Sequence, residues 1–265
     1  MDLQLRGRRA LVTGSSAGIG AAIAARLAAE GATVLVHGRR PDAVQEVIDH
    51  IAGTGGHAEP ALGDLSTETG VAQVVGTALA DGVDILVNNA GWYANTTWEH
   101  ATAEDWLRGY ERNVVTAVRL IRALVPRMRK RGWGRIVQMA SGEATMPFAT
   151  MPEYAAAKAA LVNLTVSLAK QLARTGISVN TVSPGIVVTP GVEAFYRQVA
   201  AERGWGDSWA DIEAAVLREV LDNPTGRLGR PTDVADLVAY LVSPLAGYVN
   251  GANLRVDGGS TPTTN

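Results

Sequence analysis

The sequence of 265 residues predicts an α/β protein with one doubly wound, mainly parallel sheet of about seven strands and helices on both faces. Short runs rich in β-branched residues alternate with longer alanine-rich stretches whose apolar residues recur at helical spacing. A glycine-rich turn joins the first strand to the first helix. No repeat, low-complexity tract or linker interrupts this alternation, so we expect a single domain over residues 1–265.

The elements follow one another in a regular order along the chain. Apolar, β-branched runs predict strands at residues 10–13, 33–37, 57–62, 84–87, 135–139, 177–182 and 253–256. Amphipathic stretches predict helices at residues 19–30, 41–52, 67–80, 154–174 and 232–242, and one or two helices within 104–131. Strands separated by helices of this length form right-handed βαβ units, which favours the parallel sheet.

One segment departs from this rhythm. Residues 189–224 form an insertion between a predicted strand and a predicted helix, and they contain Phe195, Tyr196, Trp205 and Trp209. Long insertions in compact domains are usually functional or disordered. We therefore expect a helical substrate lid at about residues 189–224.

The glycine-rich turn, Thr13-Gly14-Ser15-Ser16-Ala17-Gly18-Ile19-Gly20, predicts a nucleotide-binding loop. Gly14 permits a tight turn, Gly18 lets the backbone approach a pyrophosphate, and Gly20 permits close packing of the helix on the strand. The helix that begins here would meet the phosphates with free N–H groups and the positive end of its dipole.

The end of the second strand bears on the choice of nucleotide. NAD sites usually have an acidic residue there, whereas this chain has Val36-His37-Gly38-Arg39-Arg40. The planar guanidinium of Arg39 suits a ribose 2′-phosphate, and Gly38 leaves room for it. The alternative is that both arginines are merely solvated at the end of a strand. We expect NADP(H), with NAD(H) as the alternative.

Tyr154 and Lys158 lie four residues apart in an alanine-rich helical run, so they share one helix face. A buried ammonium beside a phenol favours the phenolate and is expected to lower its pKa. A tyrosine altered in this way can act as a general acid or base. The spacing alone is also typical of an ordinary helix surface.

Further segments make the chain resemble the short-chain dehydrogenase/reductase family. These segments are Gly63-Asp64-Leu65, Asn88-Asn89-Ala90-Gly91, Ser183-Pro184-Gly185 and Val256-Asp257-Gly258-Gly259, and they occur in order over nearly the whole chain. The resemblance is to members of ordinary length, similar to 3-oxoacyl-carrier-protein reductases. It implies a Rossmann fold and hydride transfer between a nicotinamide and a carbonyl or secondary alcohol substrate.

The resemblance also implies catalytic roles. Tyr154 would be the acid/base, Lys158 would hold the nicotinamide ribose, and Ser141 would bind the substrate oxygen. Asn113 would position a water that links Lys158 to solvent, although a lone helical asparagine is equally often structural. Ala140 departs from the family, many members of which have a second serine there.

For the cofactor, the resemblance implies contacts along the whole dinucleotide. Asp64 and Leu65 would lie at the adenine, Asn89 and Ala90 along the ribose, and Val187 and Thr189 at the nicotinamide amide. The complete set of cofactor-binding residues predicted is Gly14, Ser15, Ser16, Gly18, Ile19, Gly20, Arg39, Asp64, Leu65, Asn89, Ala90, Tyr154, Lys158, Val187 and Thr189.

The substrate pocket is less well defined by the sequence. Glu143 follows Ser141 closely, and it would either touch a polar substrate group or face water. An apolar pocket is predicted from Trp92, Met146, Phe148, Phe195 and Trp205; the alternative is that the lid aromatics only pack the lid. The four histidines lack metal-ligand spacing, so we expect structural or surface roles for them and no metal site.

Composition limits the partners and the location. The net charge of −2 gives no reason to expect nucleic acid or an anionic membrane as a partner. The sequence has no cysteine, no signal-like start and no uncharged stretch of membrane-spanning length, so we expect a cytoplasmic protein. Residues 114–129 and 154–173 are apolar on more than one helix face. By analogy with the family we expect a homotetramer, with a dimer as the alternative.

These expectations leave two alternatives for function. One is an NAD(H)-dependent alcohol dehydrogenase of the same family. The other is a nucleotide-sensing protein on the same fold, which would have a damaged set of catalytic residues. Asn113, Ser141, Tyr154 and Lys158 are all present, which favours an enzyme.

Overall fold

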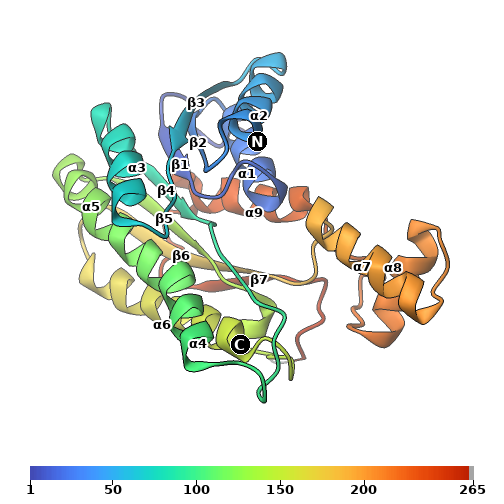
Figure 1. Cartoon of the computed structure of the whole chain (residues 1–265). Coiled ribbons are helices and arrows are strands. Elements are labelled where there is room, and N and C mark those ends of the chain that lie inside the picture. Colours follow the sequence, from blue (N-terminus) through green and yellow to red (C-terminus); the bar gives the residue numbers. More distant parts are fainter. Residues whose placement is uncertain (263–265) are drawn as a thin grey trace.

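The computed structural model describes residues 1–262. Within these residues, seven parallel strands form one sheet in the order β3-β2-β1-β4-β5-β6-β7 (Figure 1). The predicted doubly wound sheet is confirmed. The strands are β1 (Arg9–Val12), β2 (Thr33–Gly38), β3 (His57–Leu62), β4 (Ile85–Asn88), β5 (Gly134–Met139), β6 (Ile177–Pro184) and β7 (Asn253–Val256).

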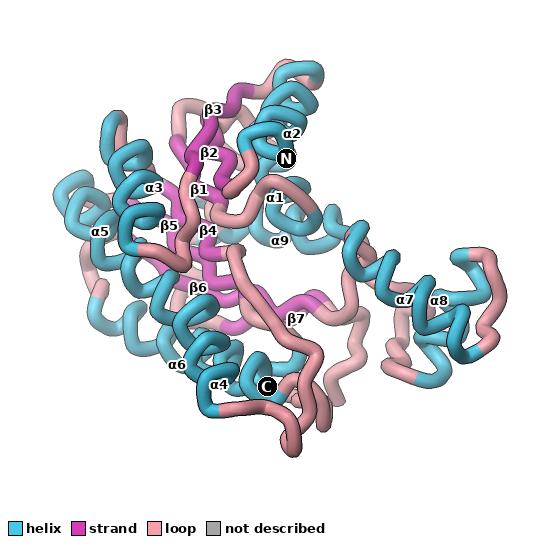
Figure 2. The backbone as a smooth tube through the Cα atoms, in the orientation of Figure 1, coloured by secondary structure: helices cyan, strands magenta, loops and turns pink. Residues whose placement is uncertain are grey.

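Helices cover both faces of this sheet (Figure 2). One face is covered by α1 (Gly18–Ala29), α2 (Pro41–Gly53) and α9 (Pro231–Leu241). The other is covered by α3 (Glu68–Ala80), α5 (Thr116–Arg131) and α6 (Pro152–Gln171). Within the described chain, no helix is long and apolar enough to cross a membrane.

The central strands are apolar throughout because both of their faces are buried. In β1, Ala10 and Val12 pack under α1 and α9, whereas Leu11 points into the opposite core. Val34 and Val36 of β2 repeat this alternation. The parallel register, with Val12 beside both Val36 and Val87, brings the carboxyl ends of β1, β2 and β4 to one edge of the sheet.

The strand order reverses beside β1, because β1 pairs with β2 on one side and with β4 on the other. Helices therefore leave in opposite directions and open a crevice beyond the carboxyl ends of these strands, where open α/β sheets bind their ligands. The turn after β1 and the loops after β4 and β5 all reach this edge.

The predicted stretch at 104–131 contains two helices joined by a π-helical turn. These are α4 (Ala103–Tyr110), the turn η1 (Glu111–Val115) and α5. The Thr102 side chain caps α4 in a reciprocal capping box with Asp105. π-Helical turns of this kind frequently occur at functional sites, and Asn113 lies within η1.

The insertion at 189–224 forms two helices, α7 (Pro190–Arg203) and α8 (Trp209–Glu219). Figure 1 shows this pair projecting from the body of the sheet, beyond the end of α9. The pair has its own apolar cluster, in which Tyr196 and Ala200 of α7 pack with Ile212 and Val216 of α8. The predicted helical character of the segment is confirmed.

Candidate active site

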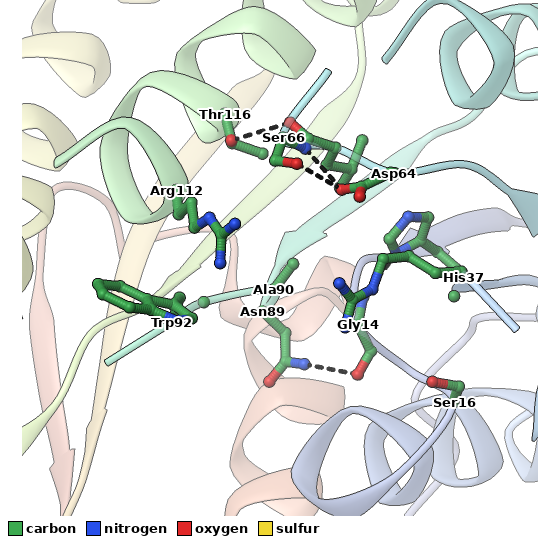
Figure 3. A pocket seen from close by; sticks show the side chains of 14 residues that line it. Gly14, Ser16, His37, Asp64, Ser66, Asn89, Ala90, Trp92, Arg112 and Thr116 are labelled. Atoms are coloured by element: carbon green, nitrogen blue, oxygen red, sulfur yellow. Dashed lines mark hydrogen bonds between the residues drawn. The ribbon is translucent and has the colours of Figure 1, made fainter. Parts of the chain in front are cut away.

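A cavity of about 350 Å³ lies beyond the carboxyl ends of β1, β2, β3 and β4 (Figure 3). Its lining comes from the end of β2, from the loops after these strands, from η1 and from the start of α5. The residues are Gly14, Ser16, His37, Gly38, Arg39, Asp64, Leu65, Ser66, Asn89, Ala90, Gly91, Trp92, Arg112 and Thr116. Most of the predicted adenosine-side residues are therefore brought together here.

The glycine-rich turn has the conformation that a phosphate loop needs. Gly14 and Gly18 have backbone φ angles of 63° and 58°, which residues other than glycine rarely adopt. A Cβ on Gly20 would lie 2.4 Å from the Gly14 carbonyl oxygen, so only glycine permits this approach. The helix α1 begins without a capping side chain and without an acid in its first turn. Its first N–H groups are therefore suited to an anion, and these residues fit a dinucleotide phosphate.

Ser15 supports the turn from within. Its hydroxyl donates to the Val12 carbonyl at 2.7 Å and accepts from the His37 N–H at 2.9 Å, and its own N–H donates to the His37 carbonyl. The polar groups of Ser15 are thus engaged in joining β1 to β2, and its predicted contact with the cofactor stays a prediction. Ser16 lines the cavity instead.

His37 and Asn89 hold the same turn. The His37 Nδ1 accepts from the Gly14 N–H at 2.8 Å, and its Nε2 donates to the Gly63 carbonyl at 3.1 Å. Burial lowers the pKa of His37, which favours this neutral tautomer. The Asn89 amide donates to the Thr13 carbonyl and also to the Gly14 carbonyl, and Figure 3 shows the second of these bonds. His37 thus has the structural role that its lack of metal-ligand spacing predicts.

The adenosine end of the cavity carries two cations. Arg39 is exposed at its rim, next to the Asp64 carboxylate, whose pKa is lowered mainly by hydrogen bonds from Ser66. Arg112 reaches the same space from η1, and its guanidinium lies 5.3 Å from the Trp92 ring centroid (Figure 3). A Cβ on Gly38 would meet Ser16 at 2.9 Å and Val44 at 2.7 Å, so glycine is required beside Arg39.

The catalytic candidates meet at the adjoining edge. Lys158 is 4% exposed and donates to the Met139 carbonyl at 2.8 Å, at the end of β5. Its Nζ lies 5.4 Å from the Tyr154 ring centroid. A Cβ on Gly91 would lie 3.3 Å from this Nζ and 2.8 Å from Asn113 Oδ1. The loop after β4 therefore passes between Asn113 and Lys158, where only glycine fits.

Ser141 links this set to the substrate side. Its Oγ accepts from the Glu143 N–H at 3.2 Å, which leaves its own hydrogen free to donate. A hydrogen bond with Ser141 lowers the pKa of Tyr154, so the two hydroxyl groups adjoin. A substrate oxygen placed between them would meet both.

The electrostatics of Tyr154 differ from the prediction. Burial raises its pKa to about 12, and the charge of Glu143 adds to this, against the opposing hydrogen bond from Ser141. Burial also lowers the pKa of Lys158 to about 8. The expected lowering of the Tyr154 pKa is therefore not found. Desolvation of the phenol outweighs its neighbours, and Lys158 is engaged with the Met139 carbonyl.

Asn113 is fully engaged with backbone. Its Nδ2 donates to the carbonyls of Trp92 and Gly109, and its Oδ1 accepts from the Trp92 N–H. The π-helical turn moves this side chain toward the loop after β4. The structural reading of Asn113 is thus supported by its contacts, and its Oδ1 also lies at Gly91 on the Lys158 side.

A second, smaller cavity of about 80 Å³ lies on the other side of Ser141. Glu143, Met146 and Phe148, three of the residues considered for the substrate pocket, line it together. Burial raises the pKa of Glu143 to about 7, and the nearby charge of Glu153 acts in the same direction. Its lining is completed by Gly142, Pro184, Gly185, Ile186, Leu221, Ser260 and Thr261.

The other aromatic candidates lie elsewhere. Trp92 lines the cofactor cavity, Phe195 is about half exposed, and Trp205 packs within the α7–α8 cluster. Trp205 also donates from its indole nitrogen to Glu219. The alternative that lid aromatics mainly pack the lid therefore describes Trp205 better than a pocket role.

Tyr196, unlike its exposed neighbour Phe195, is buried in the lid. Burial raises its pKa, and the charge of Glu143 contributes, so the phenol lies within electrostatic reach of that carboxyl. Val192, Tyr196 and Ala200 recur every four residues on α7, and all pack into the lid cluster. This periodicity is the sequence signal that distinguishes Tyr196 from its exposed neighbour.

Val187 and Thr189 connect the cofactor turn to the lid. Val187 is buried in an isolated bridge with Gly229, and the Thr189 hydroxyl accepts from the Val192 N–H to cap α7. A Cβ on Gly18 would lie 3.2 Å from the Thr189 Cγ2. The start of the lid thus contacts the phosphate turn directly.

Comparison with known proteins identifies the family. The family model described as short chain dehydrogenase matches residues 8–200, and the chain belongs to this family of oxidoreductases. The oxidoreductase YvaG of Bacillus subtilis, itself uncharacterised, is 40% identical over 266 residues, which span 98% of each chain. The 3-oxoacyl-[acyl-carrier-protein] reductase of Vibrio cholerae is 36% identical over 260 residues, which span 97% of this chain and 98% of that protein.

The fold has close counterparts among solved structures. The L-sorbose reductase of Gluconobacter frateurii, crystallised with NADPH and L-sorbose, superposes with a TM-score of 0.93. It is 36% identical, and the match covers 99% of this chain and 100% of that one. The predicted resemblance to this family and to its 3-oxoacyl reductases is confirmed.

Proposed function

We propose that this protein is an NADP(H)-dependent oxidoreductase that interconverts a carbonyl and a secondary alcohol, with Tyr154 as the general acid/base. The observation that carries the proposal is that Tyr154 adjoins both Ser141 and Lys158, and that Lys158 lies beside Gly91, which lines the larger cavity. Solved relatives hold NADPH or NADP, which supports the cofactor assignment. Arg39 at the cavity rim supports the phosphorylated form.

The residues divide the chemistry among them. NADP(H), when bound in the cavity, supplies or accepts the hydride. The Ser141 hydroxyl donates a hydrogen bond to the substrate oxygen and stabilises the charge that develops there. Tyr154 gives its proton to that oxygen in reduction and takes it back in oxidation. Lys158 brings a positive charge beside the phenol. Asn113 fixes the loop after β4, whose Gly91 lies between Asn113 and Lys158.

Incubation with NADPH and a panel of ketones tests this function. We expect the absorbance of NADPH to fall with at least one ketone. Tyr154→Phe should lower kcat about 10³-fold while leaving the Kd for NADPH within about twofold, because the phenol hydroxyl serves proton transfer. Tight NADPH binding without turnover of any carbonyl or alcohol would instead favour a nucleotide sensor. Retained activity in Tyr154→Phe would remove Tyr154 from its role.

A further inference from the structure

The small cavity beside Ser141 contains polar groups that the fold does not use. Within residues 1–262, Glu143 Oε2, Ser260 Oγ and Thr261 Oγ1 are buried atoms without a partner in hydrogen-bonding geometry. All three side chains line this cavity of about 80 Å³ together with Ser141. Buried polar groups are nearly always hydrogen-bonded in proteins, so three in one cavity indicate a ligand that supplies the partners.

Glu143 approaches the cavity from the loop after β5. Glu143 is 8% exposed, and its carboxyl group accepts a hydrogen bond from the Phe148 N–H. The other carboxyl oxygen, Oε2, has no partner among the described residues. Because the pKa of Glu143 is raised to about 7, both the donating and the accepting forms of this carboxyl are populated near neutral pH.

Ser260 and Thr261 come from a different segment, the turn that follows β7. The Asp257 carboxylate holds this turn by accepting from the N–H groups of Gly259 and Thr261 at 3.0 and 3.1 Å. Burial alone would raise the pKa of Asp257. The nearby Thr261 hydroxyl and these N–H groups together have a larger effect, so the pKa of Asp257 is lowered. The Thr261 hydroxyl lies near this carboxylate but outside hydrogen-bonding geometry, so it remains available to a ligand.

We propose that this cavity binds a small polyhydroxylated substrate, an open-chain ketose or its polyol, whose hydroxyl groups pair with Glu143, Ser260 and Thr261. The inference rests on the proposed function, because Ser141 then holds the reacting oxygen of the same molecule. The cavity is well below the 300–1,000 Å³ typical of drug-sized ligands, which fits a substrate of only a few carbons. Met146 and Phe148 supply apolar contacts to its carbon chain.

This arrangement favours polyhydroxylated molecules over plain ketones. A plain ketone would leave the buried carboxyl and hydroxyl groups unpaired, and a site built to bind hydroxyl groups rejects an analogue that lacks them by a large factor. Erythrulose and butan-2-one provide a matched pair, since both are four-carbon 2-ketones and erythrulose adds three hydroxyl groups. We expect kcat/KM with NADPH to be at least about 100-fold higher for erythrulose.

Variants separate the roles of the cavity residues. Thr261→Val and Ser260→Ala should each lower the erythrulose-to-butanone ratio of kcat/KM about tenfold, as expected for a lost hydrogen bond. Thr261→Ser should restore most of the ratio because it keeps the hydroxyl. The control is Ser178→Ala in β6, which removes another buried hydroxyl without a partner among the described residues but lies outside the cavity. It should leave the ratio unchanged.

The outcomes decide the substrate class independently of the reaction. A ratio near one, or a ratio that Thr261→Val and Ser260→Ala leave unchanged, would overturn the proposal even if both ketones are reduced. If neither ketone is reduced, the deciding measurement is the binding of erythritol to the NADP⁺ complex of Tyr154→Phe. Saturation-transfer NMR detects this binding. A signal that Thr261→Val weakens supports the polyol cavity although the reaction has failed. No signal with the NADP⁺ complex overturns it.

Discussion

At the residue scale, the pKa of Tyr154 depends on the charge of Glu143. Burial is the main cause that raises the pKa of Tyr154 to about 12, and the charge of buried Glu143 contributes in the same direction. The pKa of Glu143 is itself raised to about 7, so its charge appears as the pH rises through neutrality. Glu153 also faces Glu143, and Tyr93 faces Tyr154, with ring centroids 5.9 Å apart. The carboxyl therefore opposes formation of the phenolate at alkaline pH.

Glu143→Gln should make the phenol more acidic. The change removes a negative charge from beside Tyr154, so the phenolate forms at lower pH. In alcohol oxidation, which needs the phenolate as base, the alkaline rise of kcat/KM should begin at lower pH than in the wild type. The pH profile of kcat/KM measures this, with Glu143→Asp as the control that keeps the charge. An unshifted profile, or a shift to higher pH, would contradict the coupling.

Arg39→Ala should discriminate between the two nicotinamide cofactors. Because the guanidinium lies at the rim of the cavity and suits the 2′-phosphate, its loss should raise the KM for NADPH about 10- to 100-fold. The KM for NADH should change less than about threefold. Arg40→Ala is a suitable control, since Arg40 precedes α2 and is exposed. Equal effects on both cofactors would remove Arg39 from the phosphate site.

Sequence alone could predict residue types but not the state of each side chain. The cofactor turn and the Tyr154–Lys158 pair are recognisable from their spacing. The engagement of Ser15 within the turn and the raised pKa of Tyr154 depend on packing between segments that are distant in sequence. Arg112 and the pair Ser260 and Thr261 were missed although they adjoin Asn113 and the segment Val256-Asp257-Gly258-Gly259. Whether their side chains reach a cavity depends on packing between segments that are distant in sequence.

At the scale of elements, the close approach of α1 to the turn after β1 depends on Gly20. Gly20→Ala would place a Cβ 2.4 Å from the Gly14 carbonyl oxygen and 2.5 Å from the Asn89 amide. We expect a fall in Tm of several degrees and at least about tenfold weaker NADPH binding, because the turn must move to accommodate the methyl group.

Gly76→Ala is the matched control for this prediction. Gly76 is exposed in the interior of α3, and a Cβ there would meet nothing within 4 Å. Since glycine is unfavourable within a helix, this variant should be stabilised by about 0.4–1 kcal/mol with unchanged NADPH binding. Thermal unfolding and NADPH titration of both variants measure the contrast. Equal behaviour of the two would show that the approach at Gly20 tolerates a side chain.

The elements were largely predictable because each strand and helix has a clear periodicity. The π-helical turn η1 was not, since the sequence around Asn113 continues a helical pattern without a break. Its extra residue in the turn depends on the hydrogen bonds of Asn113 with the loop after β4. The two helices of the lid were expected only as helical content, because their packing involves a separate apolar cluster.

At the scale of the whole molecule, the parallel sheet could be predicted because alternating strands and helices permit few topologies. The sequence could not predict which ketone or alcohol the site takes, because the small cavity is formed by the loop after β5 together with the turn after β7. These segments are more than a hundred residues apart in the chain, and only the sheet order brings them together.

We propose a homotetramer, with contacts through α5 and α6, whose exposed faces retain apolar residues such as Val166. Light scattering after size exclusion should give about four times the chain mass of 27.8 kDa. Val166→Glu should lower the assembly to a dimer or monomer, because a charge in an apolar contact is poorly tolerated. Exposed Gln73→Glu in α3 is the control. A monomeric wild type would contradict this assembly.

The separate apolar cluster of α7 and α8 has a consequence for how such enzymes diversify. Because Tyr196, Ile212 and Val216 stabilise the helical pair from within, the sheet and its two main cores contribute little to that pair's own packing. The pair can therefore be exchanged for that of a relative together with the residues that pack against it, Ile186, Val188 and Leu228, while the cofactor turn and the Tyr154–Lys158 pair stay in place. Evolution can alter one end of the molecule at little cost to the chemistry at the other.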